Sequence, residues 1–295
     1  MAKGNAAVPP TVGDADMSLD LERAEREFLE RGFAVISTDH IAPLLPGALA
    51  AFDRLIERAE ALGLEGRAKV RKSDFAVAEG RGWSWGCDHI YHPDLCEQTL
   101  LDLVSLPPFP EVVRRILGER VMFSGGHGHW SPVTSDYVLH WHRDTRRHLW
   151  HHRNPDPRAH VQLCLALVDE AVVRVVPGSH LRDLEPWEER FIGSDAHADH
   201  SEQQIVAVPA GCALLLNTYT FHRAECPRTC RRRSLHFGFT RVGAAPEPGR
   251  QLKALPWMAD EAFITRQSSF LQAAIREYLA AVAVHAVKEV GDAAG

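Results

Sequence analysis

The sequence predicts a mainly β protein with helices packed against a β core. After about residue 120, short runs rich in β-branched and aromatic residues follow one another as far as residue 242, separated by Gly, Pro, Asp or Asn. Helical periodicity is confined to the two ends of the chain. No repeat and no Ser/Gly-rich linker separates these parts, so we expect one domain built around a sandwich or barrel.

The N-terminal part is predicted to be helical. Residues 1–16 are rich in Gly, Ala and Pro and lack periodicity, which indicates a flexible tail. From Ser18 the apolar residues recur at helical spacing until Gly32, and FAVIST follows as a short strand. A second helix is expected at about 47–62 before Gly63. Shorter helices are expected at 93–103 and 110–117.

The centre of the chain is predicted to form the strands and the C-terminal end a further helix. The strand-like runs are VMFSGG, DYVLHW, HVQLCLALV, VVRVVP, QQIVAVPA, CALLLNTY and SLHFGFTRV. Apolar residues return to helical spacing over 267–289. We therefore expect a domain over 17–295 that comprises a helical part (about 17–118), a β core (about 119–242) and a C-terminal helix (about 259–290).

The composition is that of an ordinary globular protein without a nucleic-acid or membrane partner. The 295 residues carry a net charge of −6, which gives no general attraction to nucleic acid or anionic lipid. The longest apolar run, IVAVPAGCALLL, is shorter than the roughly 18 residues that a spanning helix needs. Six cysteines without regular spacing favour a reducing compartment. A cytoplasmic protein is expected, and its oligomeric state is left open.

The stretch LHWHRDTRRH, residues 139–148, contains the strongest candidate metal ligands. His142 and Asp144 are two positions apart on an extended segment, so both side chains reach the same side. His222 directly follows an apolar β run and supplies a third ligand from the end of a core strand. Two imidazoles and one carboxylate leave open positions on the ion, as in iron(II) oxygenases. The sequence therefore predicts a metal site at His142, Asp144 and His222.

A candidate anion-binding arginine lies eleven residues after His222. In RRSLHFGFTR, Arg233 shares one strand face with Leu235, Phe237 and Phe239. We expect this apolar face to point into the barrel, where an arginine needs an anionic partner. A bidentate carboxylate ligand would satisfy it. The alternative is that Arg233 snorkels at the strand end or pairs with a distant carboxylate of the protein.

These residues together resemble the phytanoyl-CoA dioxygenase (PhyH) family of iron(II)- and 2-oxoglutarate-dependent oxygenases. The resemblance covers about residues 20–242 and includes VVPGSH at 175–180 and the opening EFLERGFAVIST. It implies a double-stranded β-helix (jelly roll, cupin-like) core. It also implies iron(II) held by His142, Asp144 and His222, 2-oxoglutarate held by Arg233, and O2 as oxidant. The turn LVDEAVV is shorter than the family pattern, and Ala224 stands where a small hydroxyl residue is common.

The resemblance implies an enzyme that oxidises a small organic substrate, in secondary metabolism by analogy. Hydroxylation, desaturation and oxidative cyclisation remain open, because the fate of the substrate depends on its positioning. Related halogenases replace the metal-bound carboxylate with a small residue, so Asp144 argues against halogenation. The substrate itself is not identified by the sequence.

Two other classes of function fit parts of the sequence. His140, His142 and Asp144 match the HxHxD start of a two-zinc hydrolase signature, but Thr145 stands where that motif has a further histidine. A non-catalytic β-barrel binding module with structural histidines is the second alternative. His140 is expected to share the face of His142, where it lines the pocket or is satisfied by a hydrogen bond.

Overall fold

Two antiparallel sheets form the centre of the protein in a computed structural model that describes residues 12–62, 70–73, 84–131, 136–144, 156–195, 197–244 and 256–292. The larger sheet has the order β1-β9-β6-β11-β4-β3-β2 and the smaller one β5-β10-β7-β8. The strands are β1 (Phe33–Ile36), β2 (Val70–Ser73), β3 (Ser84–Asp88), β4 (Val121–Trp130), β5 (Tyr137–Val138), β6 (His160–Ala166), β7 (Glu170–Val175), β8 (Gln204–Val208), β9 (Ala213–Leu216), β10 (His222–Cys226) and β11 (Arg233–Arg241).

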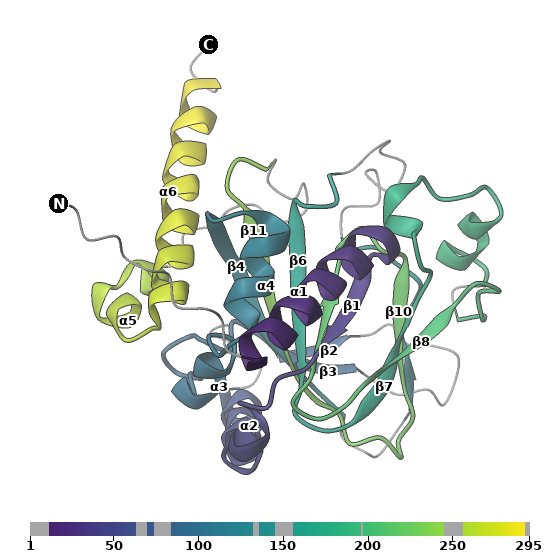
Figure 1. Cartoon of the computed structure of the whole chain (residues 1–295), viewed down its shortest axis with the longest axis horizontal. Coiled ribbons are helices and arrows are strands. Elements are labelled where there is room, and N and C mark those ends of the chain that lie inside the picture. Colours follow the sequence, from purple (N-terminus) through teal and green to yellow (C-terminus); the bar gives the residue numbers. More distant parts are fainter. Residues whose placement is uncertain are drawn as a thin grey trace.

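The core strands β4 to β11 are divided between the two sheets. Strands β4, β6, β9 and β11 lie in the larger sheet, and β5, β7, β8 and β10 lie in the smaller one. This is the arrangement of a jelly roll, or double-stranded β-helix. Figure 1 shows the smaller sheet on the side of the molecule away from α6. The predicted fold class, mainly β with flanking helices around a jelly-roll core, is confirmed.

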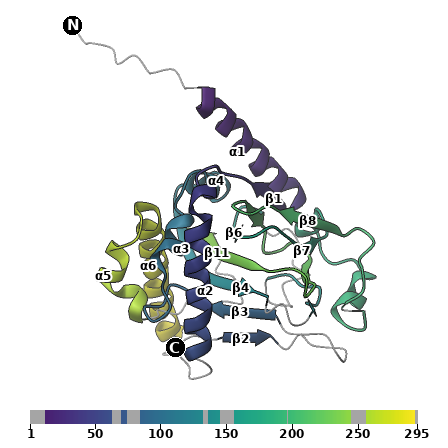
Figure 2. The same cartoon turned by 90° about the horizontal axis from the view of Figure 1, so that it is seen from below.

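Helices cover the outer face of the larger sheet. Figure 2 shows α2, α3 and α6 along the face formed by β2, β3, β4 and β11. Side chains from α1, α2, α4 and α6 share one apolar core with this sheet. The helices are α1 (Val12–Arg31), α2 (Leu45–Leu62), α3 (Gln98–Leu103), α4 (Phe109–Leu117), α5 (Glu261–Thr265) and α6 (Ser269–Asp292).

The N-terminal part differs from the prediction in two respects. Helix α1 begins at Val12, so residues 12–16, which we assigned to the tail, are helical; residues 1–11 lie outside the described part of the chain. Strands β2 and β3 lie within the segment predicted to be helical and pair with each other at the edge of the larger sheet. Strand β3 joins the sheet by pairing with β4, a tertiary contact that a short polar strand does not signal by itself.

The larger sheet is buried on both faces. Leu235, Phe237 and Phe239 point toward the helices. Cys164 and Ala166 of β6 point toward the smaller sheet, together with apolar side chains of β1 and β9. A strand of this sheet therefore has two faces that could each be apolar, and which of them points into the jelly roll depends on the layers packed around it.

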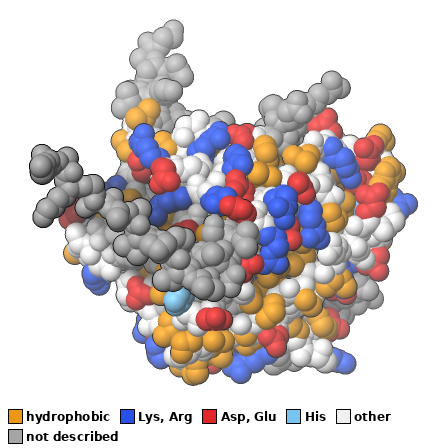
Figure 3. Space-filling model, in the orientation of Figure 1, with side chains coloured by type: hydrophobic (Ala, Val, Ile, Leu, Met, Phe, Trp, Pro, Cys, Tyr) orange, Lys and Arg blue, Asp and Glu red, His pale blue; other side chains and the backbone are white. Residues whose placement is uncertain are grey.

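The surface in Figure 3 carries basic and acidic side chains intermixed over the face in view. This mixture agrees with the small net charge of −6. None of the helices in the described ranges is both long and apolar enough to cross a lipid bilayer.

Candidate metal centre

His142, Asp144 and His222 converge at one end of the smaller sheet. His142 and His222 are paired directly across two chain segments, and each backbone N–H donates to the carbonyl of the other at 2.9 Å. One ligand atom from each of the three side chains lies within 4.8 Å of the others. In the described ranges, no other three His, Cys, Asp or Glu side chains converge in this way.

The hydrogen bonds of the two imidazoles direct their Nε2 atoms toward Asp144. Nδ1 of His142 donates to the carbonyl of His140, and Nδ1 of His222 donates to the carbonyl of Thr220, both at 2.8 Å. Because a carbonyl only accepts, each Nδ1 carries a proton. The Nε2 atoms lie 3.5 Å (His142) and 3.8 Å (His222) from the carboxylate oxygens of Asp144. Two imidazole nitrogens and one carboxylate, oriented in this way, suit a divalent first-row metal such as iron(II).

The pKa values of the two histidines move in opposite directions. Burial, followed by the charge of His142, lowers the pKa of His222 to about 4. Burial also opposes protonation of His142, but the Asp144 carboxylate and the carbonyl of His140 outweigh it and raise the pKa of His142. His222 is therefore a neutral imidazole near pH 7, which is the form that binds a metal.

A β-bulge decides which histidine faces inward. Val138 pairs with Glu225 and His142 pairs with His222, so the chain advances four positions on one side (138 to 142) and three on the other (225 to 222). The extra residue turns His140 to the outer face, where its ring lies 4.7 Å from that of His197. The expectation that His140 shares the face of His142 is therefore wrong.

The VVPGSH segment ties the two ligand-bearing segments together. Arg143, which is 2% exposed, donates from Nη2 to the carbonyls of Ser179 (2.8 Å) and Arg182 (2.9 Å). Ser179 Oγ accepts from the backbone N–H of Phe221 at 2.8 Å and donates to the carbonyl of Val176 at 2.6 Å. One serine thus contacts both the residue before His222 and the residue between His142 and Asp144, which limits their relative movement.

A buried ion pair stabilises the segment after VVPGSH. The Glu188 side chain is fully buried and accepts two hydrogen bonds from Arg182 at 2.7 Å. It also accepts from the backbone N–H of Glu185 at 2.7 Å and contacts Nε2 of His200 at 3.1 Å. Burial opposes ionisation of Glu188, but these donors outweigh it and lower its pKa from 4.5 to about 2.

We expect Glu188→Gln to lower the free energy of unfolding at neutral pH by about 3 kcal/mol. The depressed pKa means that this stabilisation is present above pH 4.5 and is lost as the pH falls toward 2. Urea unfolding of wild type and variant between pH 7 and pH 3 measures the difference. Glu111→Gln, on an exposed position of α4, is the control and should show no such difference. If the free energies of unfolding of wild type and Glu188→Gln differ by the same amount at pH 7 and pH 3, the stabilisation does not come from the ionised carboxylate of Glu188.

The structure corrects the predicted position of Arg233. Its Nε donates to Asp53 Oδ1 of α2 at 3.0 Å, and its guanidinium lies 6.0 Å from the centre of the Phe52 ring. Arg233 thus lies on the helix-covered face with Leu235, outside the jelly roll. The prediction that this face points into the barrel is wrong. The alternative is confirmed, because Arg233 pairs with a carboxylate of the protein that is distant in sequence, that of Asp53. The apolar residues of β11 mark the contact with the helices.

Arg232, which our interpretation of the sequence passed over, is the arginine inside the jelly roll. It is 3% exposed, and its Nε lies 3.0 Å from Ser234 Oγ and 3.4 Å from Glu170 Oε2. Its Nη2 donates to Nε2 of His236 at 3.3 Å. Burial raises the pKa of Glu170, although Arg232 opposes the shift. The available signal was the polar alternation of Arg232, Ser234 and His236, which marks the inner face of β11.

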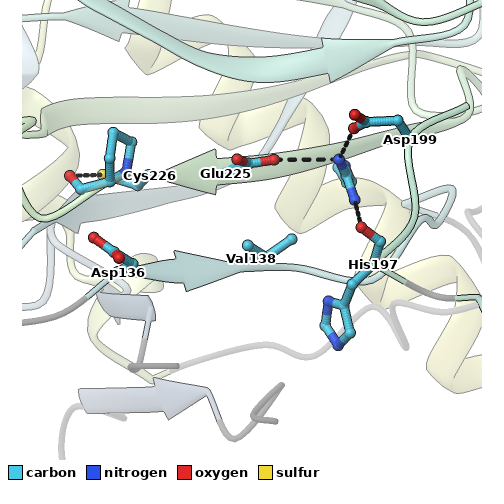
Figure 4. A pocket seen from close by; sticks show the side chains of 8 residues that line it. Asp136, Val138, His197, Asp199, Glu225 and Cys226 are labelled. Atoms are coloured by element: carbon cyan, nitrogen blue, oxygen red, sulfur yellow. Dashed lines mark hydrogen bonds and ion pairs between the residues drawn. The ribbon is translucent and has the colours of Figure 1, made fainter. Parts of the chain in front are cut away.

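A separate groove of about 340 Å³ lies on the outer face of the smaller sheet. Its lining includes Arg223, which donates to Asp199, Glu225 and the carbonyl of His197. Figure 4 labels these three partners along the groove. Arg223 precedes Ala224 and follows His222 on β10, so strand alternation directs it away from the metal ligands. The groove is therefore not part of the metal centre.

Comparison with known proteins places these features in a family. The model of the family described as phytanoyl-CoA dioxygenase (PhyH) matches residues 28–235. That range contains all three residues of the metal centre and Arg232. A search of curated proteins gives no match.

Solved structures share the fold at low sequence identity. AviO1 from Streptomyces viridochromogenes Tue57 is 20% identical, with a TM-score of 0.57, over 78% of this chain and 99% of AviO1. SnoK, a non-heme alpha ketoglutarate dependent carbocyclase from nogalamycin biosynthesis, is 17% identical, with a TM-score of 0.55, over 84% and 90%. EctD from S. alaskensis with 2-oxoglutarate and 5-hydroxyectoine is 17% identical, with a TM-score of 0.55, over 80% and 81%.

Proposed function

This chain belongs to the phytanoyl-CoA dioxygenase family and is an Fe(II)- and 2-oxoglutarate-dependent dioxygenase, and on that premise we propose that His142, Asp144 and His222 hold the iron. The observation that carries the proposal is the convergence of two Nε2 atoms and one carboxylate within 4.8 Å. The opposite side of such a three-residue centre is free for the co-substrate and O2.

Arg232 and Ser234 would hold the far carboxylate of 2-oxoglutarate. Arg232 lies inside the jelly roll beside a hydroxyl, and its pair with Glu170 Oε2 is long at 3.4 Å. A guanidinium in this position can bind a carboxylate with two parallel hydrogen bonds. The raised pKa of Glu170 favours proton uptake as a second carboxylate approaches Arg232. Arg233 is not part of this site, because its guanidinium is held by Asp53 on the outer face.

The reaction we propose is the oxidation of a small organic substrate by hydroxylation, desaturation or oxidative cyclisation. Iron(II) with 2-oxoglutarate and O2 supplies the oxidising chemistry, in which the keto acid is converted to succinate and carbon dioxide. The chain itself orients both substrates at the centre. A role in secondary metabolism is supported by the name of SnoK, which is a carbocyclase from nogalamycin biosynthesis. Asp144 supplies the metal-bound carboxylate, which argues against halogenation.

The two other functions considered at the outset are not supported. A two-zinc hydrolase would use His140, whose side chain faces outward toward His197. The jelly roll also differs from the αββα architecture of such hydrolases. A non-catalytic binding module does not account for membership of an oxygenase family.

Anaerobic addition of iron(II) and 2-oxoglutarate tests the proposal. We expect a weak visible charge-transfer band from the chelate in the wild-type protein and none in Asp144→Ala. The exposed variant His40→Phe is the control and should form the band. Tight binding of two zinc ions together with the absence of any band in the wild type would favour a hydrolase.

A further inference from the structure

His142 and His222 lie in the same local sequence pattern, in which an aromatic residue precedes the histidine and an arginine follows it. Residues 141–143 are Trp-His-Arg, and residues 221–223 are Phe-His-Arg. Successive side chains of an extended segment point to opposite faces. In both patterns the aromatic residue and the arginine therefore point away from the metal centre, toward the outer face of the smaller sheet.

These outward-pointing residues are nevertheless buried. Arg143 is 2% exposed and Arg223 is 1% exposed, and together with Arg232 they are the arginines that are buried among the described residues. Arginine is almost never fully buried unless partners compensate for the water that its guanidinium loses. The rings of Trp141 and Phe221 are buried as well and stack with their centres 5.2 Å apart. A further part of the chain must therefore cover the ligand-bearing segments from behind.

The covering segment joins β7 to β8, and the structure describes it over 176–195 and 197–203. We call this segment the brace. Arg143 binds its first part, because Nη2 donates to the carbonyl of Ser179 at 2.8 Å and to the carbonyl of Arg182 at 2.9 Å. One nitrogen thus attaches the residue between His142 and Asp144 to two backbone groups of the brace.

Arg223 binds the last part of the brace. Its Nη1 donates to the carbonyl of His197 at 2.5 Å, and its Nη2 donates to Asp199 Oδ1 at 2.6 Å. The guanidinium lies 5.2 Å from the centre of the Trp141 ring, whose Nε1 donates to the carbonyl of Ala198 at 2.9 Å. Residues that flank both histidines are therefore attached to one segment of the chain.

The backbone alone gives the two histidines limited support. The pairing of His142 with His222 is an isolated bridge rather than part of a longer strand ladder, and it consists of two reciprocal hydrogen bonds at 2.9 Å. The N–H of Asp144 adds a third, to the carbonyl of Thr218 at 2.8 Å. A side chain that is fixed on the outer face also fixes its neighbours on the inner face, because they share the same backbone. The contacts of Arg143 with the brace thus direct His142 and Asp144 inward.

We propose that Arg143 and Arg223 are positioning residues, which set the affinity and geometry of the iron site by fixing the direction of His142 and His222 from the opposite face of the sheet. If these positions served stability alone, apolar residues of similar volume would fill them at a lower desolvation cost. Removal of groups that orient metal ligands typically lowers metal affinity by about 10 to 100-fold. This inference rests on the proposed function, because the arginines act through the proposed iron ligands.

The test is an anaerobic titration of iron(II) into the full chain with 2-oxoglutarate, followed by the charge-transfer band. We expect Arg143→Met and Arg223→Met each to raise the half-saturating iron concentration about tenfold or more. The band at saturating iron should also shift in energy, because the orientation of the imidazoles changes the ligand field of the iron. Arg143→Lys should give an intermediate affinity, since the ammonium keeps the charge and donors but lacks the length of the guanidinium.

Arg158→Met is the matched control for a general loss of stability. Arg158 also donates from one nitrogen, Nη1, to two backbone carbonyls, those of Arg115 at 3.1 Å and Ile116 at 3.2 Å in the last turn of α4. Its replacement should lower the free energy of unfolding of the metal-free protein in urea. It should leave the iron affinity and the energy of the band unchanged.

The outcomes separate this inference from the proposed function. Absence of the band in the wild type would overturn the proposed iron site itself. If the wild type forms the band and both methionine variants bind iron with the same affinity and the same band energy, the positioning role is overturned. The same holds if Arg158→Met weakens iron binding as much as they do. If the methionine variants do not fold, Arg143→Lys decides, and wild-type affinity and band energy in that variant would overturn the inference.

Discussion

We expect replacement of His222 by alanine to abolish iron binding and turnover. In our proposal the imidazole supplies one of three metal-ligating atoms through Nε2, while its Nδ1 is bonded to the carbonyl of Thr220, and alanine offers no ligating atom in its place. Loss of partners that merely orient a metal ligand costs about 10 to 100-fold in affinity, and we expect the loss of the ligand itself to exceed 100-fold. Anaerobic iron titration followed by the charge-transfer band measures this directly.

His160→Ala is the matched control for His222→Ala. His160 is also a buried histidine, and its Nδ1 lies 2.9 Å from Thr240 Oγ1 on the neighbouring strand β11, away from the metal ligands. Its removal should lower stability but leave iron binding intact. Iron affinity that is equal in wild type and His222→Ala would show that the iron is held elsewhere.

We expect replacement of Arg232 by alanine to weaken 2-oxoglutarate binding by about 100-fold, because it removes the charged group that, in our proposal, binds the far carboxylate. Arg233→Ala should have little effect, since it removes one ion pair of Asp53, whose side chain is 43% exposed and which still pairs with Arg231 at 3.2 Å. Titration of 2-oxoglutarate into the anaerobic iron complex compares the two variants. If Arg233→Ala weakens 2-oxoglutarate binding and Arg232→Ala does not, then Arg233 binds the far carboxylate, as the sequence predicted.

A second substitution distinguishes a loss of 2-oxoglutarate affinity from a loss of stability in Arg232→Ala. Arg232→Ala leaves Glu170 buried without its counterion, which lowers the free energy of unfolding by about 3–5 kcal/mol. Glu170→Gln in the same chain removes the unpaired charge and should recover part of the stability. The affinity for 2-oxoglutarate should stay low in the double variant, because the guanidinium is still missing.

One of the two expected departures from the family pattern, the shortened turn, leads directly to this anchor. The shortened LVDEAVV turn joins β6, which ends at Ala166, to β7, which begins at Glu170. It places Glu170 at the start of β7, where its carboxylate reaches Arg232. Ala224, where a hydroxyl residue is common, packs in the apolar core between the sheets. In our proposal, Ser234 beside Arg232 provides the hydroxyl at this site.

Local signals in the sequence predicted most of the fold. Turn residues between short β-rich runs indicated the core strands other than β10, and helical periodicity indicated α2, α4 and α6 to within a few residues. We expected His222 at the end of the preceding apolar strand, but it begins β10 in the smaller sheet, whereas that strand, β9, lies in the larger sheet. Strands β2 and β3 were missed because β3 joins the sheet through a tertiary contact with β4, and β2 pairs only with β3. The start of α1 at Val12 was missed because the Gly- and Ala-containing segment before Ser18 lacks an apolar stripe.

By itself the sequence determined a mainly β core of the sandwich or barrel class, and the family resemblance narrowed this to a jelly roll. The HxD spacing of His142 and Asp144 is a local property, which is why these two candidate metal ligands could be predicted together. Only the tertiary structure decided which way the neighbouring side chains point. The bulge before His142 turned His140 outward, and the helices on the larger sheet made the apolar face of β11 the outer one. Arg232 therefore lies inside and Arg233 outside. A shift of one residue along a strand exchanges its two faces, and the layers packed on each face determine which one is the interior.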